Sequence, residues 1–245
     1  MAYVQADKAS GASASTLTTA GITTTAGNFL AVVISLGSGP KTLSSITDSK
    51  GNTWIAASGN PQSPNSQYNV YVYYAKNIAG GASHTVTMNS SGAGICAMSV
   101  IELSGRDITS PIAFQTAATE STGVSSHTSP ATGTLPSSGC DVLCLVGDNA
   151  FDQAFAVETY TATSTGWVLP SSGNVNTGST TATSFIMYRP GVDTTSQQAT
   201  WTNSSSNLKS AAFVLAIAAA PASGTTRVPR SLDGGMQSLS GGMSS

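Results

Sequence analysis

Charged residues are scarce in this 245-residue chain. Only 8% of its positions are Asp, Glu, Lys or Arg, where about a quarter is usual, and nine cations stand against eleven carboxylates. This balance leaves no basic surface that could release counterions from a nucleic acid, so we expect no nucleic-acid partner. The net charge of −2 and the hydrophobic content of 40% also exclude the disorder typical of highly charged chains.

Cysteine is nearly as rare, with Cys96, Cys140 and Cys144 as the only three. The number is odd and the spacing forms no disulfide framework. Cys140 and Cys144 fall in one apolar strand pattern, where they would share a face but lie too far apart for a disulfide. We therefore expect buried thiols in a protein made in a reducing cytoplasm.

Targeting and membrane segments are also missing from the pattern. The first ten residues contain no basic stretch followed by an apolar one, so we expect no signal peptide. The longest apolar run, residues 211–222, is too short to cross a bilayer and instead predicts a buried strand. We expect no membrane partner.

The chain is rich in serine, threonine and glycine, with 39, 32 and 25 of each. Short apolar runs alternate with Gly/Ser/Asn/Pro clusters, and no window keeps a helical period for three turns. The pattern predicts an all-β, antiparallel β-sandwich of jelly-roll-like type. The expected strands are Asn28–Leu36, Asn52–Ala57, Tyr68–Ala75, His84–Met88, Cys96–Leu103, Asp141–Val146, Ala154–Tyr160, Ala182–Tyr188, Gln198–Thr202 and Ala211–Ala218. Between the first two, Gly51 supplies the positive φ of a tight turn at residues 48–52.

Landmarks recur along the chain and predict two pseudo-repeated halves, near residues 20–108 and 135–220, within one domain of residues 1–220. Leu30 and Trp54 are 24 positions apart, as are Leu143 and Trp167. A second spacing of 13 positions separates Val86 from Ser99 and Thr200 from Phe213. A T-x-T pattern matches as well, Thr85-Val86-Thr87 against Thr200-Trp201-Thr202.

Residues 221–245 differ from the rest and form a C-terminal arm rich in Gly, Ser and Met. The arm contains a seven-residue repeat, Ser231-Leu232-Asp233-Gly234-Gly235-Met236 followed by Ser238-Leu239-Ser240-Gly241-Gly242-Met243. A flexible linker has no need of regularly spaced Leu and Met. We expect Leu232, Met236, Leu239 and Met243 to dock the arm onto a partner subunit, with a disordered tail as the alternative.

Groups that could perform catalysis are few and scattered, which predicts a non-enzymatic protein with no catalytic residues, no cofactor and no metal. His84 and His127 have no adjacent acid or nucleophile motif. Asp148, Asp152 and Glu158 lie close in sequence but lack the spacing of a calcium loop, so we expect solvated carboxylates. Glu102 stands inside an apolar strand, where we expect it to pair with Arg106 or to face solvent.

Aromatic residues give the best binding signal. In residues 68–74 the alternation places Tyr71 and Tyr73 on one strand face, opposite Tyr68 and Tyr74. Together with Trp54, the first pair could form an aromatic face that stacks on sugars or joins subunits. The alternative is ordinary packing inside the sandwich.

Four segments resemble a β-sandwich family found in virion proteins of tailed phages and in bacterial surface proteins. They are residues 25–30 (TAGNFL), 48–54 (DSKGNTW), 73–81 (YYAKNIAGG) and 102–105 (ELSG). The family has no shared catalytic residues to carry over, and the arm has no counterpart in it. The resemblance covers about residues 1–220 and implies a structural role on a virion, as a capsid decoration protein or an outer tail protein.

The first hypothesis is therefore a virion structural protein that is made in a host cytoplasm and assembles in many copies. Its partners would be copies of itself, trimers included, and a shell or tail protein. The second hypothesis is a carbohydrate- or receptor-binding module that binds a host-surface glycan through Trp54, Tyr71 or Tyr73.

Overall fold

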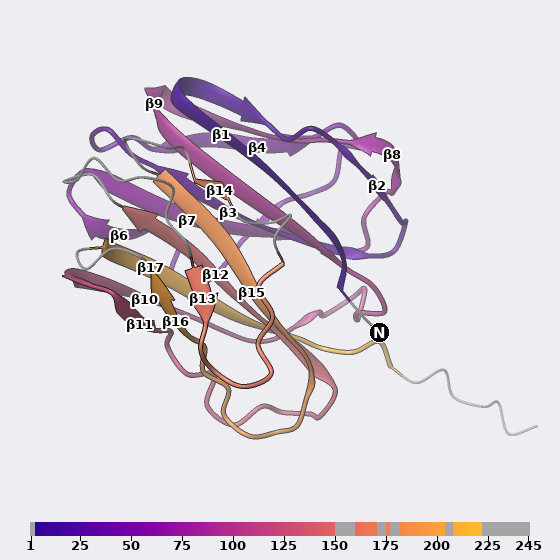
Figure 1. The fold of residues 1–245 in the computed structure, drawn as a ribbon. Coiled ribbons are helices and arrows are strands. Elements are labelled where there is room, and N and C mark those ends of the chain that lie inside the picture. The colour runs from indigo at the N-terminus through magenta and orange to yellow at the C-terminus, as the bar shows by residue number, and fades with distance from the viewer. Residues whose placement is uncertain (1–2, 150–159, 171–174, 177–181, 204–207, 222–245) are drawn as a thin grey trace, which may run out of the picture.

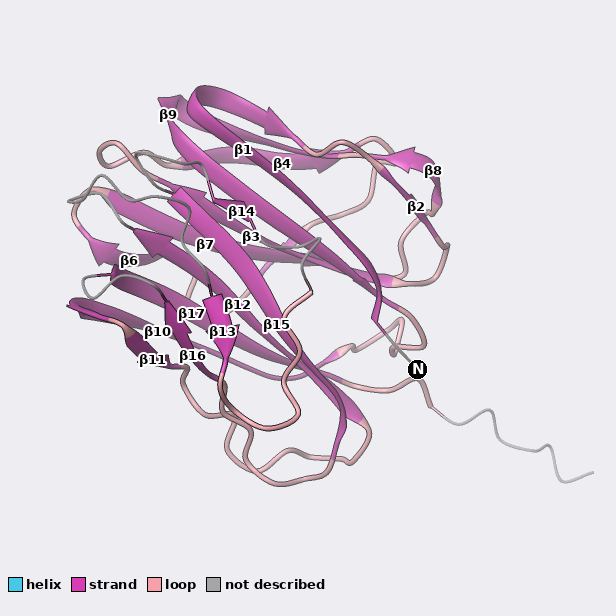
Figure 2. Cartoon of the chain, in the orientation of Figure 1, coloured by secondary structure: helices cyan, strands magenta, loops and turns pink. Residues whose placement is uncertain are grey.

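The computed structural model describes residues 3–149, 160–170, 175–176, 182–203 and 208–221. This part of the chain is all-β, with strands joined by turns and loops and without a helix, as predicted (Figure 2). Within it, therefore, no helix could cross a membrane.

The strands are β1 (Tyr3–Thr18), β2 (Ile22–Thr24), β3 (Phe29–Leu36), β4 (Leu43–Asp48), β5 (Ile55–Ala56), β6 (Gln62–Asn65), β7 (Tyr68–Ala75), β8 (Gly81–His84), β9 (Val86–Leu103), β10 (Ile112–Val124), β11 (Ser126–Thr128), β12 (Cys140–Asn149), β13 (Tyr160–Ala162), β14 (Val175–Asn176), β15 (Ala182–Val192), β16 (Thr200–Asn203) and β17 (Leu208–Ile217).

Two large antiparallel sheets form a sandwich (Figure 1). The first has the order β1-β9-β3-β7-β5, with β4 also paired to β9 and β6 to β7; the second has the order β10-β17-β12-β15-β14. The core between them is made by alternate residues of the central strands, such as Val33 and Val72 in one sheet and Leu145 and Phe213 in the other. Burial of these β-branched, aliphatic and aromatic side chains is the main source of stability.

Each large sheet also buries its outer face, because smaller strands cover it. On the first sheet, β4 and the ends of β1 and β9 place Leu17, Ile46 and Met88 over β3 and β7. On the second sheet, a three-stranded sheet of order β11-β16-β13 places Trp201 over β12 and β17. The continuous apolar runs of β3 and β12 follow from burial on both faces.

Most expected strands are present, and the exceptions have local causes. The expected strand 84–88 is divided at Thr85 between β8 and β9, and only Ile55–Ala56 of the stretch 52–57 is a strand. The long edge strands β1 and β10 were not predicted, because they consist largely of Ala, Ser, Thr and Gly without an apolar run. The expected strand 154–160 lies outside the described residues except for Tyr160.

The two large sheets have matching strand orders, with β10, β17, β12 and β15 in the places of β1, β9, β3 and β7. In these strand orders each half begins with an edge strand, β1 or β10. Both strands precede the predicted starts of the two halves, near residues 20 and 135. Leu30 packs on the outer face of its sheet, whereas Leu143 packs on the inner face. Trp54 and Trp167 both pack against outer-face clusters. The internal repeat and the jelly-roll description remain predictions.

Candidate functional site

The predicted aromatic face exists as a cluster but is largely committed to the core. Tyr71, on β7, is 6% exposed, and Trp54 and Tyr73 are half-buried against the same outer-face cluster. Tyr68 and Tyr74 contribute to the inner core instead, as the alternation predicted. The indole N–H of Trp54 donates to Asp48 at 2.8 Å, so its polar atom already has a partner.

Asp48 ends β4 and organises the turn that follows. Its Oδ1 accepts hydrogen bonds from the backbone N–H of Lys50, at 2.8 Å, and from Asn52. Gly51 has a φ of 72°, which confirms the predicted turn. His84 lies beneath this turn, with Nε2 3.2 Å from Asp48 Oδ1 and Nδ1 2.7 Å from the Thr24 hydroxyl.

Thr24, His84 and Asp48 are arranged as the hydroxyl, imidazole and carboxylate of a catalytic triad, but they are closed off from solvent. A hydroxyl and a carboxylate lie at opposite ring nitrogens, as in a hydrolase triad. However, Thr24 is 5% exposed and His84 is 1% exposed, and Asp48 is fully occupied by turn donors. A substrate could not reach the hydroxyl. The contacts of the cluster instead connect β2 and β8 to the turn at residues 48–52.

His127 lies in a second polar cluster, under the sheet β11-β16-β13. Its Nδ1 is 2.7 Å from Glu120 Oε2 and 3.2 Å from the Ser210 hydroxyl, while Asn203 donates to Nε2 at 2.7 Å. The ring stacks on Trp201 with centroids 5.2 Å apart. Burial lowers the pKa of His127, and the neighbouring Glu120 partly opposes this shift.

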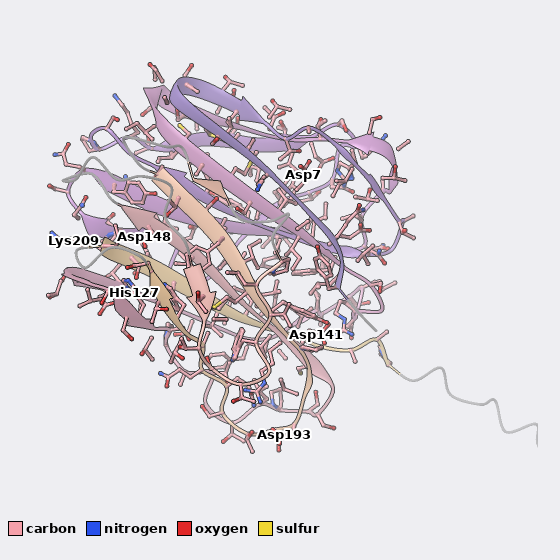
Figure 3. The ribbon with its side chains drawn as sticks, in the orientation of Figure 1. Asp7, His127, Asp141, Asp148, Asp193 and Lys209 are labelled. Atoms are coloured by element: carbon pink, nitrogen blue, oxygen red, sulfur yellow. The ribbon has the colours of Figure 1, made fainter. Side chains whose placement is uncertain are left out.

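This second cluster does not form a catalytic triad either. Ser210 and Glu120 approach the same ring nitrogen, whereas a nucleophile and an orienting acid must use different nitrogens of the imidazole. Of the ionisable groups labelled in Figure 3, Asp7, Asp141 and Asp193 lie far apart, whereas Asp148 and Lys209 lie on the same side of the molecule as His127.

Glu102 neither pairs with Arg106 nor faces solvent, contrary to the sequence expectation. It is fully buried on β9, where Oε1 accepts from the Thr25 N–H at 2.9 Å and from Asn28 at 2.7 Å, and Oε2 accepts from Gln5 at 2.5 Å. The loop before β3 covers the end of the strand and so encloses the carboxylate. Glu102 therefore joins β1, β9 and this loop.

Arg106 pairs with Asp141 instead. The guanidinium Nη1 is 3.2 Å from Asp141 Oδ2, and both side chains are 1% exposed. Asp141 also accepts from the Tyr188 hydroxyl at 3.2 Å and from the Gly191 N–H at 2.8 Å. Burial, aided by the Asp141 charge, raises the pKa of Tyr188 to about 12. The pair ties the segment between β9 and β10 to the first residues of β12.

The remaining candidates offer no metal site among the described residues. Asp148 is buried rather than solvated, contrary to expectation, and Asp152 and Glu158 lie outside the described residues. The three cysteines are free and buried, as predicted, with Cys140 and Cys144 in the same outer-face cluster. The docking residues expected in the arm, Leu232, Met236, Leu239 and Met243, also lie outside the described residues.

A feature not predicted from the sequence is a pair of surface arrays made of hydroxyl and amide side chains. One array covers β1, β9 and β4, where Thr18, Thr87 and Thr47 stand side by side. The other covers β11, β16 and β13. The T-x-T patterns were a signal for these arrays, but only the strand register shows which threonines become neighbours.

Comparison of the chain with protein-family models, with curated proteins and with solved structures finds no match.

Proposed function

We propose that this protein is a non-enzymatic structural component of a tailed-phage virion, either a capsid decoration protein or an outer tail protein. The observation that carries the proposal is the pair of long edge strands. β1 has 16 residues and β10 has 13, and in the described part of the chain each has a neighbouring strand on one side only.

Natural sheets protect their edges with charges, prolines or short strands. β1 carries only Asp7 and Lys8 as charges and β10 only Glu120, and neither contains proline. Such edges suit pairing with a neighbouring subunit through backbone hydrogen bonds. The ionisable clusters support the same proposal, because Glu102, Arg106 and His127 are occupied by internal contacts and present no reactive group.

The C-terminal arm would supply a second contact in this proposal. Leu232, Met236, Leu239 and Met243 would enter grooves on a shell or tail protein. Many weak contacts repeated around a symmetric assembly add up to stable attachment.

The direct test is to purify tailed-phage particles from the organism that encodes this chain and to identify their proteins by mass spectrometry. We expect peptides of this chain in density-banded particles, in many copies per particle. Recombinant full-length chain should rebind particles stripped of it, whereas a variant without residues 223–245 should stay folded and remain unbound. Absence from particles would contradict the virion role, and unchanged rebinding of the truncated chain would contradict the role of the arm.

The edge strands are tested separately by Ser10→Lys and Ala118→Lys, which place a charge at exposed positions of β1 and β10. We expect these variants to fold normally and to lose self-association, measured by native mass spectrometry. Ser66→Lys is the matched control, because it adds the same charge in an exposed turn outside both edge strands. Equal assembly of all three variants would contradict pairing through the edges.

A further inference from the structure

The two surface arrays share one design on opposite outer faces of the sandwich. In each, three adjacent strands bear two rows of polar side chains that face outward, exposed or half-buried, and between them one row that faces the core, buried or half-buried. The rows of the first array are Thr16–Asn89–Ser45 and Thr18–Thr87–Thr47, about Leu17–Met88–Ile46. The rows of the second array are Ser126–Thr202–Thr161 and Thr128–Thr200–Thr163, about His127–Trp201–Ala162.

The outward-facing rows are regular because cross-strand partners lie on the same face of a sheet. Neighbouring strands are about 4.8 Å apart, and alternate residues repeat at about 6.7 Å along a strand. Eight of the twelve side chains are exposed, and the four on the central strands, Thr87, Asn89, Thr200 and Thr202, are half-buried. Eleven of the twelve carry a hydroxyl and the twelfth, Asn89, carries an amide. The buried row fixes each array on the core, so the polar groups are held on a rigid support.

Side-chain hydrogen bonds orient several members within each array. The hydroxyls of Thr18 and Thr87 are 2.9 Å apart in the first array, and those of Thr163 and Thr200 are 2.6 Å apart in the second. A hydroxyl can donate one hydrogen bond and accept two, so these groups keep capacity for a ligand. The arrays are thus ordered before a ligand binds, which reduces the entropic cost of binding.

The chemistry of the arrays selects the kind of ligand. None of the twelve side chains is charged, so a polyanion or polycation would find no counter-charge there. A neutral sugar chain is rich in hydroxyl groups, which both donate and accept hydrogen bonds and can therefore bind the hydroxyl groups of the arrays.

We propose that the two arrays bind a neutral, repeating polysaccharide. Two similar sites on one rigid chain suit a ligand that offers the same unit many times, because the second contact follows at high effective concentration. This binding does not depend on the aromatic face formed by Trp54, Tyr71 and Tyr73, since Tyr71 is buried. It is also independent of the virion role. In that role the edge strands would pair through backbone groups and the arm through its own side chains, whereas the arrays bind through side chains on the outer faces.

The test is affinity electrophoresis of the full-length chain in native gels that contain dextran, mannan or galactan. We expect at least one of these neutral polymers to retard the chain, with little change between low and high salt, because no charge takes part. Thr18→Val with Thr87→Val removes a bonded hydroxyl pair from the first array, and Thr163→Val with Thr200→Val does so in the second. Each double variant should weaken binding about tenfold, and the combination should abolish it.

Thr119→Val is the matched control, because Thr119 is an exposed threonine on β10 outside both arrays. It should bind like the wild type, and the melting temperatures of all variants should confirm folding. The proposal is overturned if none of the three polymers retards the chain, or if retardation is unaffected by the array variants. Binding to dextran sulfate that salt abolishes would also overturn it. Loss of self-association in the array variants would show instead that a second copy of the chain occupies these faces.

Discussion

At the scale of single residues, several of the few ionisable groups of this chain are buried and connect strands and loops through hydrogen bonds and ion pairs. Glu102, buried on β9, is the clearest case, because its carboxylate accepts hydrogen bonds from Thr25, Asn28 and Gln5 and forms no ion pair with any cation in the described part of the chain. From its place in an apolar strand, Glu102 was expected to pair with Arg106 or to face solvent. Burial by the preceding loop was not visible in the strand pattern, because it depends on a segment more than 70 positions away in sequence.

Replacing Glu102 by alanine should destabilise the protein by about 2–4 kcal/mol. The change leaves the buried Asn28 amide and two partly buried donors, Thr25 N–H and Gln5, without their acceptor. An unsatisfied buried donor costs about 1–3 kcal/mol. Urea denaturation followed by tryptophan fluorescence would measure the loss. Gln67→Ala, in an exposed turn, should change the free energy of unfolding by less than about 0.5 kcal/mol. An equally small effect at Glu102 would contradict its role in connecting strands and loops.

The histidine under the second array should make stability depend on pH. Burial lowers the pKa of His127 in the folded state, so the unfolded chain binds the proton more readily. The contribution of neutral His127 is therefore present above the unfolded value of about 6.5 and is lost as the pH falls below it. We expect the free energy of unfolding to fall between pH 7 and pH 5, by at most about 1.4 kcal/mol per pH unit for one proton. His127→Gln should flatten this dependence, and an identical slope in the variant would refute the assignment.

The three thiols should be unreactive in the native protein. Burial raises the pKa of Cys96 to about 11 and raises that of Cys144 further, and only the thiolate reacts rapidly. A disulfide-exchange reagent at pH 8 should label less than one thiol per chain within minutes and three after denaturation. Fast labelling of the folded chain would contradict the buried positions of Cys96, Cys140 and Cys144.

At the scale of elements, the sequence predicts the central strands well and the edges badly. β3, β7, β12, β15 and β17 are buried on both faces, and their apolar runs identify them with few errors. β1 has only two buried residues and β10 has none, so these strands need no apolar run and small polar residues can form them. The surface arrays were missed for a related reason, because a T-x-T pattern shows alternation within a strand but not the partner strands that complete the array.

One glycine allows the two large sheets to pack closely. A Cβ on Gly147, in β12, would come within 2.4 Å of the Ser35 hydroxyl and 2.5 Å of a Val70 methyl. Gly147→Ala should therefore cost about 1–3 kcal/mol through overpacking of the core. Gly92→Ala is a suitable control in β9, where the nearest atom is the end of the Lys41 side chain at 3.5 Å. Chemical denaturation of both variants should separate them, and equal stability would show that the sheets can move apart at little cost.

At the scale of the whole molecule, the matching strand orders raise the question of whether the halves fold independently. Their inner faces share one core, and buried hydrogen bonds cross it, such as that from the Ser99 hydroxyl to the Ser184 carbonyl at 2.9 Å. The Arg106–Asp141 ion pair adds a connection between the segment that joins the halves and the second sheet. Neither sheet would keep a buried inner face without the other.

We therefore expect a single unfolding transition, with fluorescence and circular dichroism changing together in urea. Arg106→Met should lower the free energy of unfolding by about 3–5 kcal/mol, because it leaves the buried Asp141 carboxylate without its cation. Adding Asp141→Leu to this variant should restore part of the loss, since the uncompensated charge is then gone. Two separate transitions would instead indicate that each half is a domain of its own, and the Arg106 substitution would then affect only one of them.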